Sequence, residues 1–376
     1  SDFDTADQIL KREAYDSNGK NMIIGNSNGS NGRSSINIYD IVDGSSVQFK
    51  SKVQLDLGTL ISDSLDDTGD ASGGTTTSPF GDSFVGLRRA IKDNFDSSFE
   101  NADLDTEVSE LVIYDLKISK LGQVAISTRV KISYGGTQII FNVIVLFNVS
   151  SVVQGSSAIR AGLPTYYTTN YKYNILEESN SGSSKHSSGY TIAFDGEDLY
   201  FDRRSGQWGQ VWKLSQSNDY SQATQVIDYG SHPDALNYVT ANNGIYISEE
   251  SKKAAFGVPI KIYDDYNSTD KLMFVGAHLF DPYVFNTLSL PHTPNAIGAV
   301  YIYRRALSST NWTYFGAVYG KGNTSSNINT NLSQYKDSSL SNKQYGLFGY
   351  DFDYSEGNLV VSEPGGNGSE SVNVGK

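Results

Sequence analysis

The feature that most constrains the fold of this chain is a unit of three short apolar segments that recurs along the sequence. In the clearest copy the segments are residues 260–263, 272–277 and 298–303, and all three are rich in β-branched and aromatic residues. A polar turn separates the first two segments, as in successive strands of an antiparallel meander. The unit therefore predicts a small antiparallel sheet.

Other copies of the unit lie on both sides of this one. They span residues 16–39 and 348–364 and, more loosely, residues 194–212. Recurrence of one supersecondary unit is typical of repeat architectures, in which every copy packs against its neighbours. An antiparallel unit of this kind predicts one blade of a β-propeller.

The recurring unit resembles the FG-GAP repeat, which is the blade unit of integrin-α-type β-propellers. That family takes its name from a Phe-Gly before one strand and a Gly-Ala-Pro after the next. The matching residues here are Phe256-Gly257 with Gly276-Ala277, and Phe348-Gly349 with Ser362-Glu363-Pro364. The resemblance implies an all-β fold, namely a β-propeller of four-stranded antiparallel blades with long loop insertions. At roughly 50 to 60 residues a blade, 376 residues would fill about six or seven blades.

We expect residues 1–376 to form a single β-propeller domain that is closed by its N-terminal strand. The C-terminal copy supplies only two strands, and an unpaired strand edge invites aggregation. Residues 3–10 have no hairpin partner nearby in the sequence. We therefore predict that residues 7–11 pair with the C-terminal unit at 346–376. The alternatives are that residues 1–12 form a free tail, or an arm that pairs with a neighbouring subunit.

Three segments depart from the blade pattern. Residues 63–82 and 178–189 are polar and of low complexity, so we predict flexible loop insertions that cannot bury a core. Residues 107–153 hold two long β-rich runs on either side of Gly135-Gly136, which is a hairpin signal. Because these runs are longer than blade strands usually are, a β module inserted at 107–153 is an alternative to a blade.

Charge and composition limit the partners and the compartment. The chain has 29 Lys and Arg against 42 Asp and Glu, a net charge of −13 that repels phosphate backbones, so we expect no nucleic-acid partner. The longest apolar run, residues 139–147, is shorter than the ~20 residues of a membrane-spanning helix, so we expect no membrane insertion. The lack of cysteine excludes disulfides and thiolate catalysis. A cysteine-free β protein rich in polar loops suits an extracellular, cell-surface or virion location.

Seven Asn-x-Ser/Thr sequons occur in the chain, and they permit N-glycosylation if the source has the machinery. They begin at Asn28, Asn148, Asn267, Asn311, Asn323, Asn331 and Asn367. In a chain so rich in Asn and Ser, several such sequons would arise by chance.

The turns that precede the apolar segments are the candidate binding sites. Integrin-type blades place a calcium loop at this point, so the resemblance implies Ca²⁺ as a cofactor, held by side-chain oxygens at alternate positions. The candidate metal ligands are Asp351, Asp353 and Ser355 in the C-terminal copy, Asp265, Asn267 and Thr269 in the central copy, and Asp16 and Asn18 in the N-terminal copy. The same residue types occur in ordinary tight turns, because their side chains bond the local backbone. A purely structural role is therefore the alternative.

The chain lacks the common catalytic motifs, since it contains no Gly-x-Ser-x-Gly elbow, no Walker loop and no His-Glu-x-x-His. We therefore predict a non-enzymatic β-propeller that acts as an adhesion or structural interaction module. The expected partner is a protein or glycan on a cell surface, or neighbouring subunits of an assembly. One alternative is a carbohydrate-active propeller that binds or cleaves glycans. Another is a self-assembling subunit of a surface filament.

Overall fold

The structure is a computed structural model in which β-strands dominate. It describes residues 13–28, 33–42, 44, 46–56, 108–134, 137–151, 165–168, 176–177, 188–205, 208–218, 220, 223–229, 256–278, 298–320 and 347–363. Helix in these residues is limited to two 3-10 turns, η3 (Val149–Ser151) and η5 (Gln216–Asn218). The described part of the chain is thus all-β, built from antiparallel sheets, as the sequence predicted.

The chain divides into two compact units. Unit 1 comprises Ser1–Leu199 and Ser215–Ser221, and unit 2 comprises Tyr200–Leu214 and Gln222–Lys376. The predicted pairing of residues 7–11, and the predicted loop at 63–82, lie outside the described residues. Residues 178–187 of the predicted loop at 178–189 also lie outside the described residues, and residues 188–189 begin a strand.

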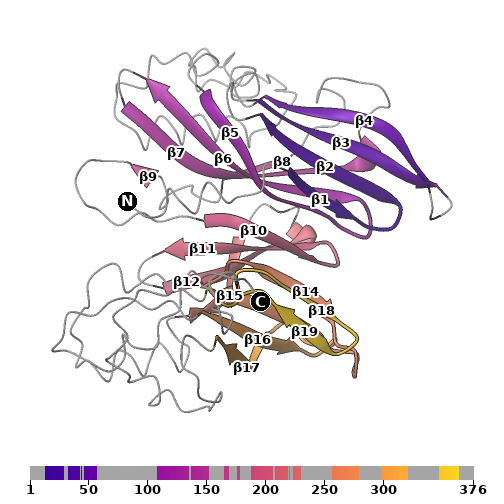
Figure 1. The fold of residues 1–376 in the computed structure, drawn as a ribbon, viewed down its shortest axis with the longest axis vertical. Helices are drawn as coiled ribbons and strands as arrows, with labels where there is room; N and C mark the ends of the chain where they lie inside the picture. The colour runs from indigo at the N-terminus through magenta and orange to yellow at the C-terminus, as the bar shows by residue number, and fades with distance from the viewer. Residues whose placement is uncertain are drawn as a thin grey trace, which may run out of the picture. The chain divides into compact units, whose positions relative to one another are not determined.

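Sheet 1 contains the N-terminal copy of the repeat. Its strands are β1 (Glu13–Ser17), β2 (Asn21–Asn28), β3 (Arg33–Val42) and β4 (Ser46–Asp56), hydrogen-bonded in chain order (Figure 1). Alternate residues of β2 and β3 face the core, and Ile23, Ile36 and Ile38 are fully buried there. This alternation is the period of a strand with one buried face.

Sheet 2 contains the long β-rich runs. Its strands are β5 (Val108–Ile118), β6 (Gln123–Tyr134), β7 (Thr137–Asn148) and β8 (Thr165–Thr168) in chain order, with β9 (Leu176–Glu177) also paired to β7. The predicted hairpin across residues 135–136 is confirmed, because Tyr134 pairs with Thr137 and the register continues to Gln123 and Asn148. Sheet 2 therefore begins with the same four-strand meander as sheet 1.

Sheet 3 contains the looser copy. Its strands are β10 (Ser188–Asp195), β11 (Asp198–Ser205), β12 (Trp208–Leu214) and β13 (Ala223–Asp228), again in chain order. The boundary between the two units falls within β11.

Sheet 4 contains the central copy and lies in unit 2. Its strands are β14 (Ile260–Asp264), β15 (Lys271–Ala277), β16 (Ala299–Arg305) and β17 (Thr313–Tyr319). The three predicted segments of the central copy correspond to β14, β15 and β16. All of β15 after Lys271 is buried, whereas Tyr314 and Phe315 of β17 are exposed. The core of sheet 4 therefore lies at its middle strands.

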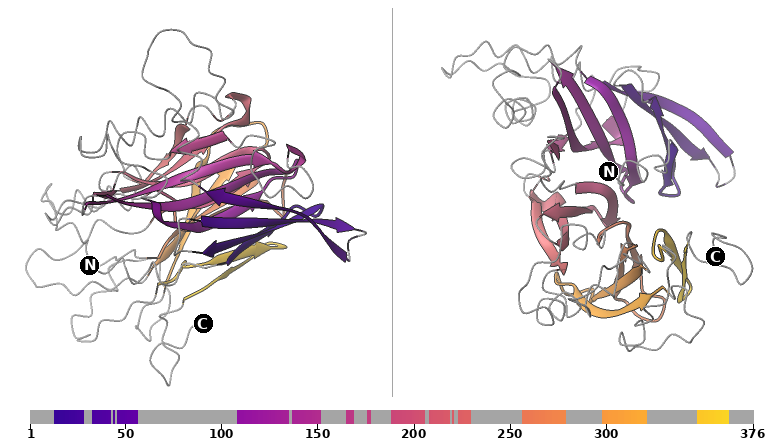
Figure 2. Two further views of the ribbon diagram at one scale, coloured as in Figure 1. Left: turned by 90° about the horizontal axis from the view of Figure 1, so that it is seen from above. Right: turned by 60° about the vertical axis from the view of Figure 1, so that its left-hand side comes forward.

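The C-terminal copy forms a two-stranded hairpin of β18 (Phe352–Ser355) and β19 (Asn358–Val361). The hairpin stands beside the orange strands of sheet 4 in the right-hand view of Figure 2, and Asp353 accepts from Tyr263 on β14. Leu272, Phe274, Val300 and Phe352 form one buried cluster between this hairpin and sheet 4. Burial of apolar side chains holds the two elements together.

The Phe-Gly dipeptides lie where one sheet meets the next in unit 2. Phe256 is almost fully buried, with its ring 4.7 Å from that of Tyr229 and 5.6 Å from that of Tyr301. A Cβ at Gly209, near the start of β12, would overlap the carbonyl oxygen of Phe256. The dipeptide before β14 thus lies directly on the third strand of sheet 3.

The second Phe-Gly dipeptide repeats this arrangement one sheet further on. A Cβ at Gly298, just before β16, would overlap the carbonyl oxygen of Phe348, and one at Gly349 would lie 2.5 Å from the carbonyl oxygen of Ala299. Only glycine permits so close an approach of two backbones. Each Phe-Gly dipeptide is therefore a junction between one sheet and the third strand of the preceding sheet.

Candidate functional site

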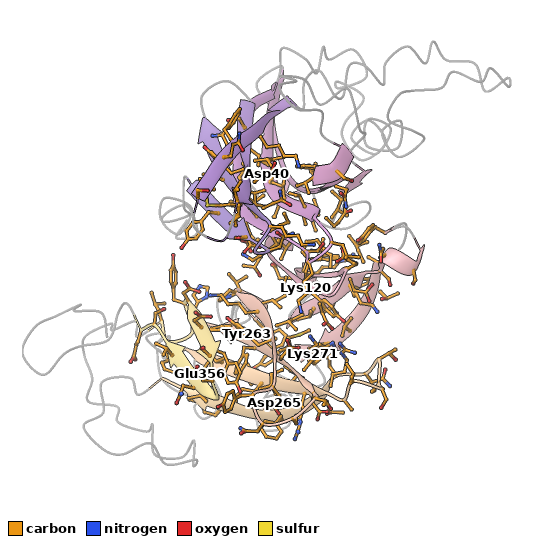
Figure 3. The ribbon with its side chains drawn as sticks, turned by 90° about the vertical axis from the view of Figure 1, so that its right-hand side faces the viewer. Asp40, Lys120, Tyr263, Asp265, Lys271 and Glu356 are labelled. Atoms are coloured by element: carbon orange, nitrogen blue, oxygen red, sulfur yellow. The ribbon has the colours of Figure 1, made fainter. Side chains whose placement is uncertain are left out.

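The β14–β15 turn holds the first group of candidate ligands, and Asp265 organises it (Figure 3). Its Oδ1 atom accepts a hydrogen bond from the backbone N–H of Asn267 at 3.1 Å, and its Oδ2 atom accepts one from the hydroxyl of Ser268 at 2.7 Å. These two bonds, assisted by the nearby guanidinium of Arg304, lower the pKa of Asp265. The carboxylate therefore fixes the turn on its own backbone.

A cation from the protein itself already occupies this turn. The Nε atom of Arg304 on β16 lies 2.7 Å from Oδ2 of Asp270, and its Nη2 atom donates to Ser268 Oγ at 3.2 Å. The other two candidates, Asn267 and Thr269, are exposed, and their side chains make no hydrogen bond within the described residues.

The second group of candidates lies at the β18–β19 hairpin. Oδ1 of Asp351 accepts from the N–H of Phe352 at 2.9 Å and pairs with Lys261 Nζ at 2.8 Å. Oδ1 of Asp353 accepts from the hydroxyl of Tyr263 at 2.7 Å. Burial and this carboxylate both raise the pKa of Tyr263, so the phenol remains a donor.

Ser355, the third candidate of this group, is exposed and pairs with Asn358 at the end of the hairpin. Asp353 and Ser355 both lie in the extended strand β18. Residues two apart in a strand lie about 7 Å apart and point to the same face, so Asp353 and Ser355 project from one face of β18.

The third group of candidates, Asp16 and Asn18, lies in unit 1. Oδ2 of Asp16 accepts from the N–H of Ile118 at 2.8 Å. Burial raises the pKa of Asp16, although this hydrogen bond opposes the rise. Asn18 caps its own turn by accepting from the N–H of Asn21 at 2.8 Å, and its Nδ2 atom donates to the carbonyl of Ser119 at 2.8 Å.

These contacts define how the turns would have to change to hold calcium. In the part of the chain that the structure describes, no three His, Cys, Asp or Glu side chains are grouped to hold a metal ion. At the β14–β15 turn, an ion on Asp265 and Asp270 would have to displace Arg304, and one on Asp351 would compete with Lys261. Calcium binding by the eight candidate residues stays a prediction. At these two turns the ion would have to replace Arg304 or compete with Lys261.

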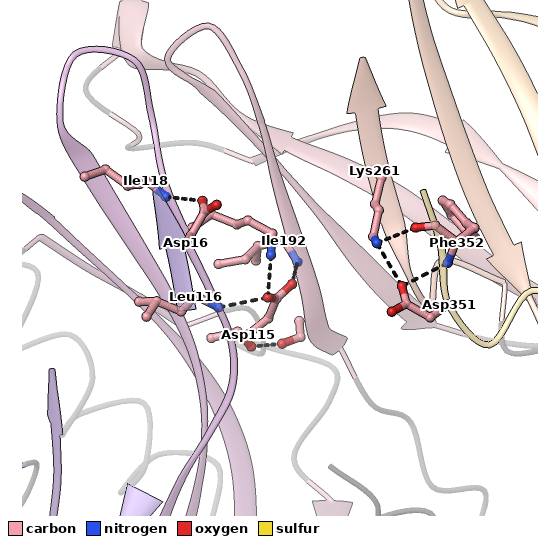
Figure 4. A network of polar contacts seen from close by, with 11 residues as sticks. Asp16, Asp115, Leu116, Ile118, Ile192, Lys261, Asp351 and Phe352 are labelled. Atoms are coloured by element: carbon pink, nitrogen blue, oxygen red, sulfur yellow. Dashed lines mark hydrogen bonds and ion pairs between the residues drawn. The ribbon is translucent and has the colours of Figure 1, made fainter. Parts of the chain in front are cut away.

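Carboxylate contacts join the first strands of successive sheets (Figure 4). The sequence did not indicate this series. Asp16 on β1 accepts from Ile118 on β5 at 2.8 Å, and Asp115 on β5 accepts from Ile192 on β10 at 3.1 Å. In unit 2 the contact is an ion pair between Lys261 on β14 and Asp351, next to β18, so the carboxylate belongs to the later strand. We call these three contacts the first-strand bridges.

One sequence signal accompanies the first-strand bridges, because each of their aspartates follows a tyrosine. The pairs are Tyr15-Asp16, Tyr114-Asp115 and Tyr350-Asp351. The signal is not specific, since Tyr39-Asp40 and Tyr263-Asp264 have the same two residues, and these carboxylates contact Asn21 and Lys271 of their own sheets.

The turns that follow the first strands are linked in the same series. In unit 1, Asn18 of the β1–β2 turn donates to Ser119 of the β5–β6 turn. The hydroxyl of Ser119 in turn donates to Glu197 of the β10–β11 turn at 2.5 Å. In unit 2, the N–H of Tyr266 in the β14–β15 turn lies 3.5 Å from the hydroxyl of Tyr354 on β18. In unit 1, neighbouring sheets therefore meet at equivalent strands and at equivalent turns, whereas in unit 2 the turn meets a strand.

Comparisons with known proteins give no match to this chain, either among protein-family models or among curated proteins. Within the described residues, no helix has the length and apolar character needed to cross a membrane.

Proposed function

We propose that the chain is a β-propeller that serves as an adhesion or structural interaction module on the surface of a cell or virion. The observation that carries the fold proposal is the series of contacts between equivalent elements. In a propeller, four-stranded meanders stand around a central axis, so the same strand of each blade should contact the same strand of the next. In unit 1, the first-strand bridges and the linked turns follow that rule.

A two-layer sandwich accounts less well for these contacts. Sandwiched sheets pack face to face at about 10 Å through apolar side chains of their inner faces. In unit 1, hydrogen bonds join the first strands of three sheets in series, Asp16 with Ile118 and Asp115 with Ile192. Serial contact of equivalent strands favours blades over layers.

The same contacts favour an interaction module over a carbohydrate-cleaving enzyme. Glycosidases need a pair of carboxyl groups that face the substrate. Here the carboxylates of Asp16 and Asp115 accept backbone N–H groups of the neighbouring strand, and Asp351 pairs with Lys261. These groups hold sheets together, so binding would be left to the loops, as is usual for rigid β scaffolds.

Ring closure can be tested with spin labels, because the chain contains no cysteine that would take up label elsewhere. Lys20→Cys and Ser355→Cys would place labels at exposed positions of the first and last described hairpins. Lys20→Cys with Lys120→Cys is the control pair, since Asn18 and Ser119 already join those two turns at 2.8 Å. In a closed ring the two pairs should give similar distances by pulsed electron paramagnetic resonance. A much longer distance for the first pair would refute closure.

The proposed function predicts saturable binding without turnover. Chain produced in bacteria, labelled on an introduced cysteine, would be applied to a glycan array and to intact cells, and light scattering after size exclusion would give its mass. Saturable binding by a monomer supports the proposal. Turnover of a glycan that one carboxylate substitution abolishes would overturn it in favour of a carbohydrate-active propeller. Recovery of large oligomers alone would favour the filament subunit.

A further inference from the structure

Two of the sequons come together at one end of sheet 4, although they are distant in the sequence. Asn267-Ser268-Thr269 lies in the β14–β15 turn, and Asn311-Trp312-Thr313 lies at the end of the β16–β17 turn. Both turns are at the same end of the sheet, since Lys271 pairs with Arg305 and Arg304 pairs with Thr313.

Arg304 connects the two sequons directly. Its Nη2 atom donates to the hydroxyl of Ser268, the middle residue of the first sequon, at 3.2 Å. Its carbonyl oxygen accepts from the hydroxyl of Thr313, the last residue of the second, at 3.0 Å. The two acceptor asparagines therefore belong to one small surface, which we call the sheet 4 turn face.

Both asparagine side chains on this face are left available, because another residue shapes each turn. Asp265 accepts the N–H of Asn267 at 3.1 Å, and the hydroxyl of Ser309 accepts the N–H of Asn311 at 3.0 Å. In both turns the capping side chain stands two residues before the asparagine. Asn267 and Asn311 are exposed, and neither side-chain amide makes a hydrogen bond within the described residues.

Asn148 provides a contrast within the same chain. Its Oδ1 atom accepts from the N–H of Ser150 at 2.9 Å and from the hydroxyl of Ser150 at 2.7 Å. Its Nδ2 atom lies 3.4 Å from the carbonyl oxygen of Leu121, and the middle residue of this sequon, Val149, is buried. The Asn148 sequon is thus part of the folded structure, so a bulky group on its amide would disrupt these contacts.

We propose that Asn267 and Asn311 are N-glycosylation acceptors and that the sheet 4 turn face carries glycans. The co-reactant is an oligosaccharide linked through pyrophosphate to a lipid, and an oligosaccharyltransferase catalyses the step. Nδ2 of the asparagine forms a bond to C1 of the first sugar, and the bond from C1 to the pyrophosphate oxygen breaks. The pyrophosphate leaves with the electron pair, and one amide proton passes to a base. The inference rests on the proposed surface location, because this modification belongs to exported proteins.

The test is glycopeptide mass spectrometry on the chain secreted from eukaryotic cells, before and after treatment with peptide N-glycosidase. We expect glycan on the peptides that contain residues 267 and 311, and an unmodified Asn148 peptide. Thr269→Ala and Thr313→Ala should each abolish modification at the corresponding asparagine. Thr269→Ser and Thr313→Ser keep the hydroxyl and should retain it, which separates loss of the sequon from a change in folding.

Two results would overturn the inference. One is recovery of the chain with residues 267 and 311 unmodified, whether it is in the medium or in the cells. The other is equal modification of Asn148 and Asn267, because the structural distinction between them would then have no effect. The binding assays above use unglycosylated chain from bacteria. A failure to bind there would count against the proposed function, and it would not alter the glycopeptide result.

Discussion

Replacing Gly298 by alanine tests the junction between sheet 4 and the C-terminal hairpin. Gly298 has a φ of +81°, where an L residue costs roughly 1–2 kcal/mol relative to glycine. Its added Cβ would also overlap the carbonyl oxygen of Phe348. Because that atom belongs to the backbone, the junction must shift, and overpacking of this kind costs about 1–3 kcal/mol. We therefore expect Gly298→Ala to lower the free energy of unfolding by roughly 2–5 kcal/mol.

Two other glycines of unit 2 separate these contributions. Gly357 has a φ of +80°, but a Cβ there would lie no closer than 3.6 Å to its nearest neighbour, so Gly357→Ala should show the backbone cost alone. Gly316 has open space around it and no left-handed φ. Gly316→Ala should be neutral, or stabilising by up to about 1 kcal/mol through the unfolded chain.

Guanidinium unfolding followed by tryptophan fluorescence is the assay, because all three tryptophans, Trp208, Trp212 and Trp312, lie in unit 2. The expected order of stability is Gly316→Ala, then Gly357→Ala, then Gly298→Ala. If Gly298→Ala is no less stable than Gly357→Ala, the Phe-Gly dipeptide does not lie on this strand, and the reasoning from the junction fails.

Three further outcomes follow from the bridges and the turns. Asp115→Ala leaves the N–H of Ile192 without this acceptor and should destabilise unit 1 by about 1–3 kcal/mol, measured by hydrogen exchange of β10. Burial raises the pKa of Asp16 above its ordinary 3.8, so the folded chain holds that proton more tightly than the unfolded chain does. Stability should therefore fall as the pH rises from 3.8 through the raised value, and Asp16→Asn should remove this part of the fall in pH-dependent unfolding curves. If calcium binds the β14–β15 turn, calorimetric titration should show tighter binding to Arg304→Gln and none to Asp265→Asn; no heat with Arg304→Gln would contradict calcium at this turn.

The strands of the central copy could be predicted because their signal is local. Residues 260–263, 272–277 and 298–303 are apolar, β-branched and aromatic, and they form β14, β15 and β16. Composition within a short window is enough to identify such strands, and polar residues mark the turn between the first two.

The partners of the candidate site residues could not be predicted, because they are set by contacts between sheets. Asp115 bonds a residue 77 positions away, and the hydroxyl of Tyr263 reaches Asp353 across 90 positions. Nothing in a short window specifies which strand of another sheet lies opposite a carboxylate. The oxygen-rich turns were visible in the sequence, whereas the Arg304 guanidinium that occupies one of them was not.

The links between neighbouring turns show why the repeat is clear in the strands and weak elsewhere. Asn18 meets Ser119 through an amide and a carbonyl, and Ser119 meets Glu197 through a hydroxyl and a carboxylate. The positions correspond from sheet to sheet, but the chemical groups do not. Any donor and acceptor of suitable length can satisfy two adjacent turns, so the fold constrains where a link occurs and not which residues form it. Glycines such as Gly209 and Gly298 are different, because a Cβ at these positions would overlap backbone atoms whatever the neighbouring side chains are. In a repeat held together in this way, the residue type is therefore constrained at such glycines.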